Sequence, residues 1–201
     1  MGDFLVNCIK VIVALLLIPI VVAGLLAFYG HLEMYPAPMK DFFSGGMLAF
    51  LITFLFLYQF WGVFEFGQKI MTNIFKFLSP LDRIVSYLFP FYVVVVMILF
   101  FISTRFVQTH AHDHFFVFFV GFALTMHWLL VAQELQQAEK ALIKPNYLLL
   151  ITVIFIFNLC LTILLFDLIQ GEFSFPSFVN ETYRNAKDLY TFSFEKVITL
   201  K

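Results

Sequence analysis

Three of the five histidines of the chain lie within five residues, in the run Thr109-His110-Ala111-His112-Asp113-His114. Imidazole and carboxylate groups are the ligands that zinc and related metals prefer. In a helix His110 and His114 lie one turn apart on one face, whereas in an extended segment all three histidines share a face. The run is therefore a candidate site for a divalent metal, with His110, His112, His114 and Asp113 as ligands.

Two other interpretations compete for the same run. Asp113 precedes a long apolar stretch, so it is well placed to cap the N-terminus of a helix or to lie near its positive end. Histidine also titrates near neutral pH, which would make the run a pH-sensitive contact. Four ligands from so short a run are sterically awkward, and a metal site would need His31 and Glu33 from elsewhere. Capping is the interpretation that the sequence favours.

Three polar side chains fall inside or at the edge of other long apolar stretches, namely His127, Gln59 and Asn158. Ionisable groups at membrane depth are rare and often functional. A transported solute could use them, and His127 could bind haem, but a b-type haem between helices generally needs a second axial ligand. No other histidine lies at comparable depth in the sequence. Hydrogen bonding between neighbouring helices is the simpler interpretation.

The elements that must position these side chains are transmembrane helices. Apolar residues make up 62% of the 201 residues and charged residues only 12%, whereas soluble domains carry about 45–50% and about 25%. Crossing about 30 Å of hydrocarbon takes roughly 20 helical residues. Five apolar stretches are long enough, over residues 11–29, 46–64, 84–103, 115–133 and 147–169. The sequence therefore predicts an all-α integral membrane protein with about five transmembrane helices.

A short amphipathic segment, residues 66–78, follows the second apolar stretch. Its apolar positions are Phe66, Ile70, Ile74 and Leu78, and its polar positions are Lys69, Thr72, Asn73 and Lys76. This spacing predicts a short helix in the membrane interface, with its lysines toward lipid phosphates. The earlier connection, residues 31–45, is expected to be an outer surface loop, because Pro36 and Pro38 hold it extended.

The fourth stretch continues as a helical pattern beyond its apolar part. Val131, Leu135, Ala138 and Leu142 recur at spacings of four, three and four residues. Such a narrow stripe is typical of a helix that packs against another helix. The partner helix would come from this chain or from another subunit.

The chain divides into a polytopic transmembrane helical domain, residues 1–170, and an extramembrane C-terminal tail, residues 171–201. The tail is polar enough to leave the membrane, yet it keeps many aromatic residues, so we expect it to dock on a surface. Lysines and arginines near the predicted spans number six on the N-terminal side of the membrane and four on the other. This bias predicts a cytoplasmic N-terminus and an outer tail, in a bacterial plasma (inner) membrane.

Several function classes are disfavoured by composition and motifs. The net charge is −1, which suggests no nucleic-acid partner, and two cysteines are too few for a disulfide framework. Phosphate-binding loops and hydrolase motifs are absent. We therefore expect a non-enzymatic membrane subunit of a larger membrane or envelope complex, with an assembly, anchoring or transport-accessory role. Its partners would be the lipid bilayer and other membrane subunits, or a second copy.

Two alternatives remain open at this point. The first is a small oligomeric transporter or channel that uses the intramembrane polar residues. The second is a metal-handling membrane protein that uses the histidine run, with a divalent metal as the one cofactor the sequence suggests.

Overall fold

The computed structural model describes residues 2–57, 60–106, 113–138 and 144–199. These residues form eight α-helices and one short 3₁₀ helix, with no strand among them. Long apolar stretches favour helices in lipid, because a helix satisfies its own backbone hydrogen bonds. The predicted all-α membrane fold is therefore confirmed.

Four helices are long and apolar enough to cross a membrane: α1 (Gly2–Leu32), α2 (Ala37–Leu57), α6 (Asp113–Ala138) and α7 (Pro145–Gln170). Two further helices, α4 (Asp82–Leu88) and α5 (Phe91–Phe106), pass the same test only as a pair, with a bend of 56° between them. The pair brings the number of spans to five when it counts as one crossing. The break falls at Pro90, which lacks a backbone donor and disfavours helix for the residue before it.

The second span differs from its prediction. The predicted outer loop at residues 31–45 is wrong, since α1 continues to Leu32 and α2 already begins at Ala37. Pro38 stands in the first turn of α2, where no intrahelical donor is needed, so this proline favours the helix instead of an extended chain. The span consequently ends at Leu57, and the apolar residues after it belong to α3 (Trp61–Ile74) and the 3₁₀ helix η1 (Lys76–Leu78).

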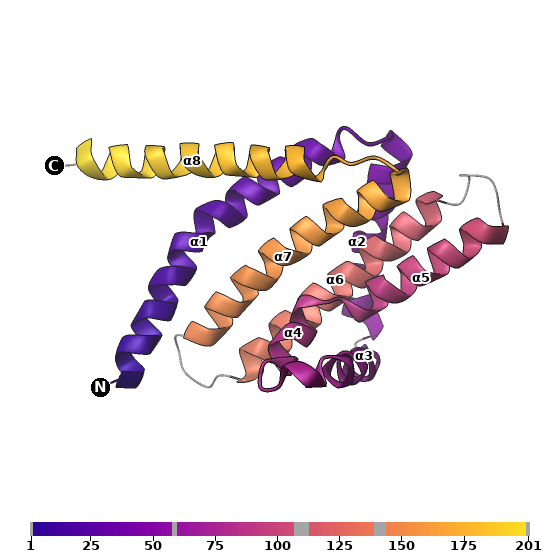
Figure 1. The fold of residues 1–201 in the computed structure, drawn as a ribbon, viewed down its shortest axis with the longest axis horizontal. Helices are drawn as coiled ribbons and strands as arrows, with labels where there is room; N and C mark the ends of the chain where they lie inside the picture. Colours follow the sequence, from indigo (N-terminus) through magenta and orange to yellow (C-terminus); the bar gives the residue numbers. More distant parts are fainter. Residues whose placement is uncertain (1, 58–59, 107–112, 139–143, 200–201) are drawn as a thin grey trace. The chain divides into compact units, whose positions relative to one another are not determined.

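The chain forms two compact units, one of residues Met1–Met34 with Leu135–Lys201 and one of residues Tyr35–Glu134. In the first unit α1 packs along α7 and also against α8 (Phe175–Thr199), as Figure 1 shows. Lys10 Nζ, in the N-terminal part of α1, donates to Asn146 Oδ1, at the N-terminal end of α7, over 2.6 Å. In the described part of the predicted tail, residues 175–199 form one helix, and this helix packs against α1. The domain division at residue 170 stays a prediction.

A buried carboxylate, Asp167, joins α7 to α8. Its oxygens accept hydrogen bonds from Ser174 N at 2.9 Å, Phe175 N at 2.8 Å and Ser174 Oγ at 2.5 Å. These backbone donors belong to the start of α8, which has no intrahelical acceptor for them, and a negative charge is favourable at that end. Gly171 adopts the left-handed conformation, φ 70°, that ends α7. Together they fix the direction in which α8 leaves α7.

In the second unit α2 and α6 approach each other backbone to backbone. A Cβ added at Gly46 would lie 2.0 Å from Phe118 O, and one added at Gly121 would lie 2.3 Å from Phe43 O. Small residues at such crossings let membrane helices pack closely. The aromatic pairs Phe50–Phe122 and Phe100–Phe116 extend this packing toward α5, with ring centroids 5.2 and 5.3 Å apart.

We predict that Gly46→Ala destabilises the protein by about 1–3 kcal/mol, the usual cost of overpacking. The new methyl group would meet the carbonyl of Phe118, which cannot move without shifting α6. Thermal unfolding in a mild detergent measures the effect. Gly45→Ala is the matched control, because its Cβ would meet only the Phe118 ring, at 3.9 Å. Equal melting temperatures for the two variants would contradict the close crossing.

Candidate functional site

A polar network ties α4 to α6 in the second unit. Arg83 Nη2 lies 2.8 Å from Glu134 Oε1, and Arg83 Nε donates to the Tyr87 hydroxyl at 2.8 Å. The Tyr87 hydroxyl in turn donates to Glu134 Oε1 at 2.7 Å. The Arg83 side chain is 69% exposed, so solvent or headgroups screen the ion pair and its contribution to stability is small. Its effect is to orient the two helices relative to each other.

His127 lies deeper in α6 and is buried. Its Nε2 atom is 2.9 Å from the carbonyl oxygen of Tyr87, in the last turn of α4. Carbonyls in a last turn lack partners within their helix, and a carbonyl can only accept, so His127 Nε2 carries the proton and donates it. In a continuous helix the Tyr87 carbonyl would accept from a backbone N–H of the next turn. The break between α4 and α5 removes that donor, and His127 takes its place.

The space beside His127 is a small cavity at the junction of α3, α5 and α6. Gly67, Gln68, Tyr92 and Met126 are among the residues that line it. Its volume is about 10 Å³, which is room for one water molecule at most. This cavity is therefore too small to hold a solute.

The other two predicted intramembrane groups do not join His127 in the described part of the chain. Gln59 lies outside the described residues. Asn158 is buried in α7, where its side-chain Nδ2 donates to Ile154 O at 2.8 Å and its backbone carbonyl accepts from Thr162 Oγ1 at 2.7 Å. Asn158 belongs to the first unit and His127 to the second, and each makes these bonds within its own unit.

The histidine run is only partly described. His110 and His112 lie outside the described residues, so the predicted metal site stays a prediction. Asp113 stands in the first turn of α6, where its charge is favourable. His114 packs against the ring of Phe42, with centroids 4.5 Å apart. Among the described residues, no three potential metal ligands come together.

His31, the predicted additional ligand, is fully buried near the end of α1. Its ring lies edge-on to Phe178 of α8, with centroids 6.0 Å apart. The residue thus contributes to the contact between α1 and α8.

The predicted packing stripe on α6 is divided. Val131 and Leu135 are buried within this chain, whereas Ala138 is exposed. Leu142 lies outside the described residues. The first half of the stripe, Val131 and Leu135, is already covered by other residues of this chain.

The α3 helix divides its circumference into three strips. Phe64, Gly67 and Met71 are buried toward α4 and α5. A second strip is apolar yet exposed, and a third is polar. The exposed apolar residues are Val63, Phe66 and Ile74, and the polar ones are Glu65, Lys69 and Asn73. The predicted amphipathic helix is confirmed, although it spans Trp61–Ile74 instead of residues 66–78, and its predicted apolar face is mostly the exposed strip.

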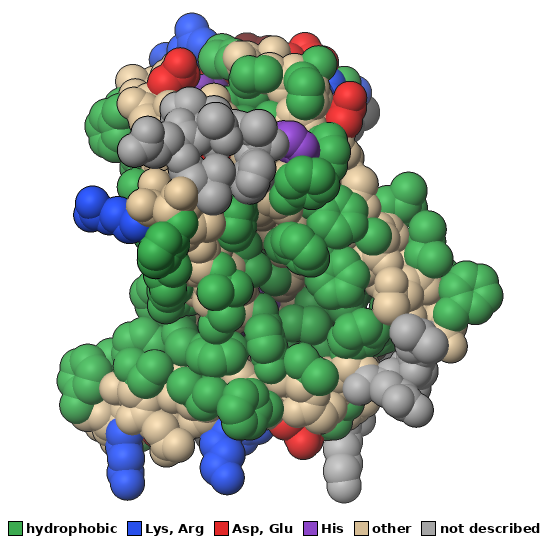
Figure 2. All heavy atoms as spheres, turned by 90° about the vertical axis from the view of Figure 1, so that its right-hand side faces the viewer, with side chains coloured by type: hydrophobic (Ala, Val, Ile, Leu, Met, Phe, Trp, Pro, Cys, Tyr) green, Lys and Arg blue, Asp and Glu red, His purple; other side chains and the backbone are tan. Residues whose placement is uncertain are grey.

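Figure 2 shows the same division on one face of the molecule, with hydrophobic side chains above and basic side chains projecting from the lower edge, where α3 lies. An exposed apolar strip beside a basic one is the pattern of a helix that lies in the membrane interface.

The α8 helix repeats this arrangement in the first unit. Phe178 and Ala186 are buried toward α1, and Val179, Tyr183 and Phe194 form an exposed apolar strip. Sequence analysis missed this helix, although Phe178, Thr182, Ala186 and Leu189 recur at helical spacing. The many polar residues of the segment concealed the pattern.

Comparison with known proteins finds no matching family model, no similar curated protein and no similar solved structure. What can be inferred about function therefore comes from the chain's own residues.

We predict that His127→Phe lowers stability by about 0.6–1.7 kcal/mol, the range measured for hydrogen bonds between membrane helices. Phenylalanine keeps a flat ring but cannot donate to Tyr87 O. His127→Gln is the control, because its amide can still donate. Unfolding of the detergent-solubilised protein measures both, and a Phe variant as stable as wild type would show that the bond contributes nothing.

Proposed function

We propose that this protein is a non-enzymatic membrane subunit that anchors or assembles a larger membrane complex. The observation that carries the proposal is the C-terminal end of α8. Each of residues 191–196 is exposed, and Figure 1 shows this end of α8 extending past α1.

Two aromatic rings stand on this end of α8 and face in different directions. Phe192 is 58% exposed and Phe194 is 64% exposed. Two residues apart in a helix correspond to about 200° of rotation, so the two rings lie on nearly opposite sides. Lipid can cover only one side of a helix that lies at a membrane surface. The other aromatic side, that of Phe192, is best covered by a protein.

Phe192 is an exposed aromatic residue, a type that is enriched at protein interfaces. Lys196 Nζ lies 4.8 Å from the centre of the Phe192 ring, which leaves the ring more than half exposed. Aromatic anchors beside polar residues are common at such interfaces. The Asp167 cap holds the direction of α8, so the end of the helix is presented in a fixed orientation and loses little entropy on binding.

We predict that Phe192→Ala weakens the association with a partner subunit by about 5- to 30-fold, the effect of losing one aromatic anchor of about 1–2 kcal/mol. The measurement is recovery of a stoichiometric complex from native membranes in a mild detergent. Ser193→Ala is the matched control, since Ser193 Oγ donates to Leu189 O of its own helix at 2.7 Å. A chain that purifies alone, with equal behaviour in both variants, would contradict the proposal.

The proposed location is a bacterial plasma membrane, with the N-terminus and α3 on the cytoplasmic side and α8 outside. The excess of lysines and arginines on the N-terminal side supports this orientation. If the α4–α5 pair crosses once, three crossings separate α3 from α8, and the two surface helices lie on opposite sides.

We predict that a thiol reagent that does not cross membranes labels Lys187→Cys in intact cells and labels Lys69→Cys only after lysis. Both side chains are exposed, and Cys8 and Cys160 are first replaced by alanine. The reverse pattern would invert the orientation. Labelling of both positions from one side would show instead that α4 and α5 form a re-entrant hairpin.

A small transporter or channel is the second candidate. The break between α4 and α5 favours it, because interrupted helices often surround the substrate in transporters. The cavity at this break holds one water molecule at most, so the subunit role comes first. If the protein purified as a homo-oligomer and one solute raised its melting temperature, the transporter role would be favoured over the subunit role. The metal-handling alternative depends on His110 and His112, and it stays a prediction.

A further inference from the structure

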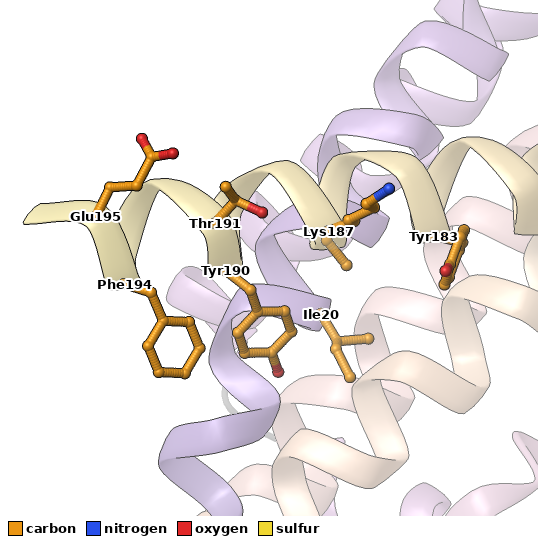
Figure 3. Close-up of a pocket in the computed structure, with 8 residues that line it drawn as sticks. Ile20, Tyr183, Lys187, Tyr190, Thr191, Phe194 and Glu195 are labelled. Atoms are coloured by element: carbon orange, nitrogen blue, oxygen red, sulfur yellow. The ribbon is translucent and has the colours of Figure 1, made fainter.

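A groove of about 590 Å³ runs between the underside of α8 and the middle of α1. Figure 3 shows its lining residues, with Ile20 on α1 and the others on α8. The Tyr190 and Phe194 rings lie below the α8 ribbon, whereas the Lys187 ammonium group lies at the level of the ribbon. The groove is therefore apolar on its inner side, and its rim carries one cation, Lys187, and one anion, Glu195.

The apolar wall is held in place by a hydrogen bond. The Tyr190 hydroxyl donates to the backbone carbonyl of Leu16, close to Pro19 in α1. Pro19 lacks the backbone donor that would bond to the carbonyl of Leu15, so the bond from Tyr190 lies one residue from that gap in the helical hydrogen bonds. The ring of Tyr190 consequently reaches from α8 to α1 and forms part of the groove wall, between Phe194 and Tyr183 along α8.

We infer that the groove opens toward the bilayer. Its α1 wall belongs to a helix that is long and apolar enough to cross the membrane, and the neighbouring Leu15 and Leu16 side chains are exposed. Molecules that reach this wall come from the lipid phase. A helix about 10 Å wide fills roughly 420 Å³ per turn of 5.4 Å, so the groove holds little more than one turn of a partner helix. A flexible hydrocarbon chain fits this space better.

We propose that the groove binds one membrane phospholipid, with an acyl chain against Ile20, Tyr190 and Phe194 and with its phosphate beside Lys187. The long lysine side chain can follow the apolar wall and keep its charge at headgroup level. Burial of the chain is favourable by apolar transfer, and the lysine supplies the charge that complements the phosphate. This site is separate from the Phe192 side of α8, so it does not depend on the proposed partner.

The experiment uses the full chain, stripped of lipid in a mild detergent and titrated with dioleoylphosphatidylcholine, with bound lipid counted by native mass spectrometry. We expect one lipid per chain. Lys187→Glu should weaken binding about fivefold or more, the scale of one cation near a lipid surface. Arg184→Glu is the matched control, because Arg184 is an exposed cation on the same helix that does not line the groove.

A second pair of variants tests the apolar part. Thr191→Trp places a large ring in the groove, whereas Ser193→Trp places the same ring at an exposed position that does not line it. Only the first should abolish binding, and dioleoylglycerol, which lacks the phosphate, should bind more weakly than the phospholipid. Equal lipid binding by all four variants, or no bound lipid in wild type, would overturn the proposal. Loss in the Thr191 variant with full binding in the Lys187 variant would overturn the phosphate contact.

Discussion

The requirement that backbone N–H and C=O groups be hydrogen-bonded in lipid governs this structure. Continuous helices meet it over α2, α6 and α7. Two prolines, Pro19 within α1 and Pro90 between α4 and α5, each remove one backbone donor, and near each of them a side chain from another helix bonds to a carbonyl. His127 donates to the carbonyl of Tyr87 where α4 ends, and Tyr190 donates to the carbonyl of Leu16 near Pro19. The positions of these two polar side chains therefore follow from the backbone carbonyls to which they donate.

The same requirement explains how far the sequence could predict the fold. Apolar length alone identifies helices that cross a membrane, and it identified the regions of the spans. It did not identify where the second span begins, because Pro36 and Pro38 are compatible with an extended loop and with the first turn of a helix. The two prolines start a helix only if the residues after them continue as helix, and residues 39–57 do.

The functional residues were harder to predict, for a different physical reason. That His127 is polar and lies in an apolar stretch is visible in the sequence, but its partner is the carbonyl of a residue 40 positions away. The side chain of Tyr87 gives no signal for that bond. The α8 helix was missed because its apolar residues are divided between a strip that packs on α1 and a strip that faces outward. Each strip alone is too narrow to stand out among so many polar residues.

The carboxylate of Asp167 has a consequence for how the protein is made. Its acceptors are filled by the backbone of Ser174 and Phe175, which leave the ribosome seven and eight residues after it. Until those residues emerge and turn back, the end of α7 carries a charge without these donors, and charges are costly to hold in lipid. Stable placement of the last span is therefore coupled to formation of the first turn of α8, so that a released chain ending at residue 172 would hold α7 less firmly in the membrane than one ending a few residues later.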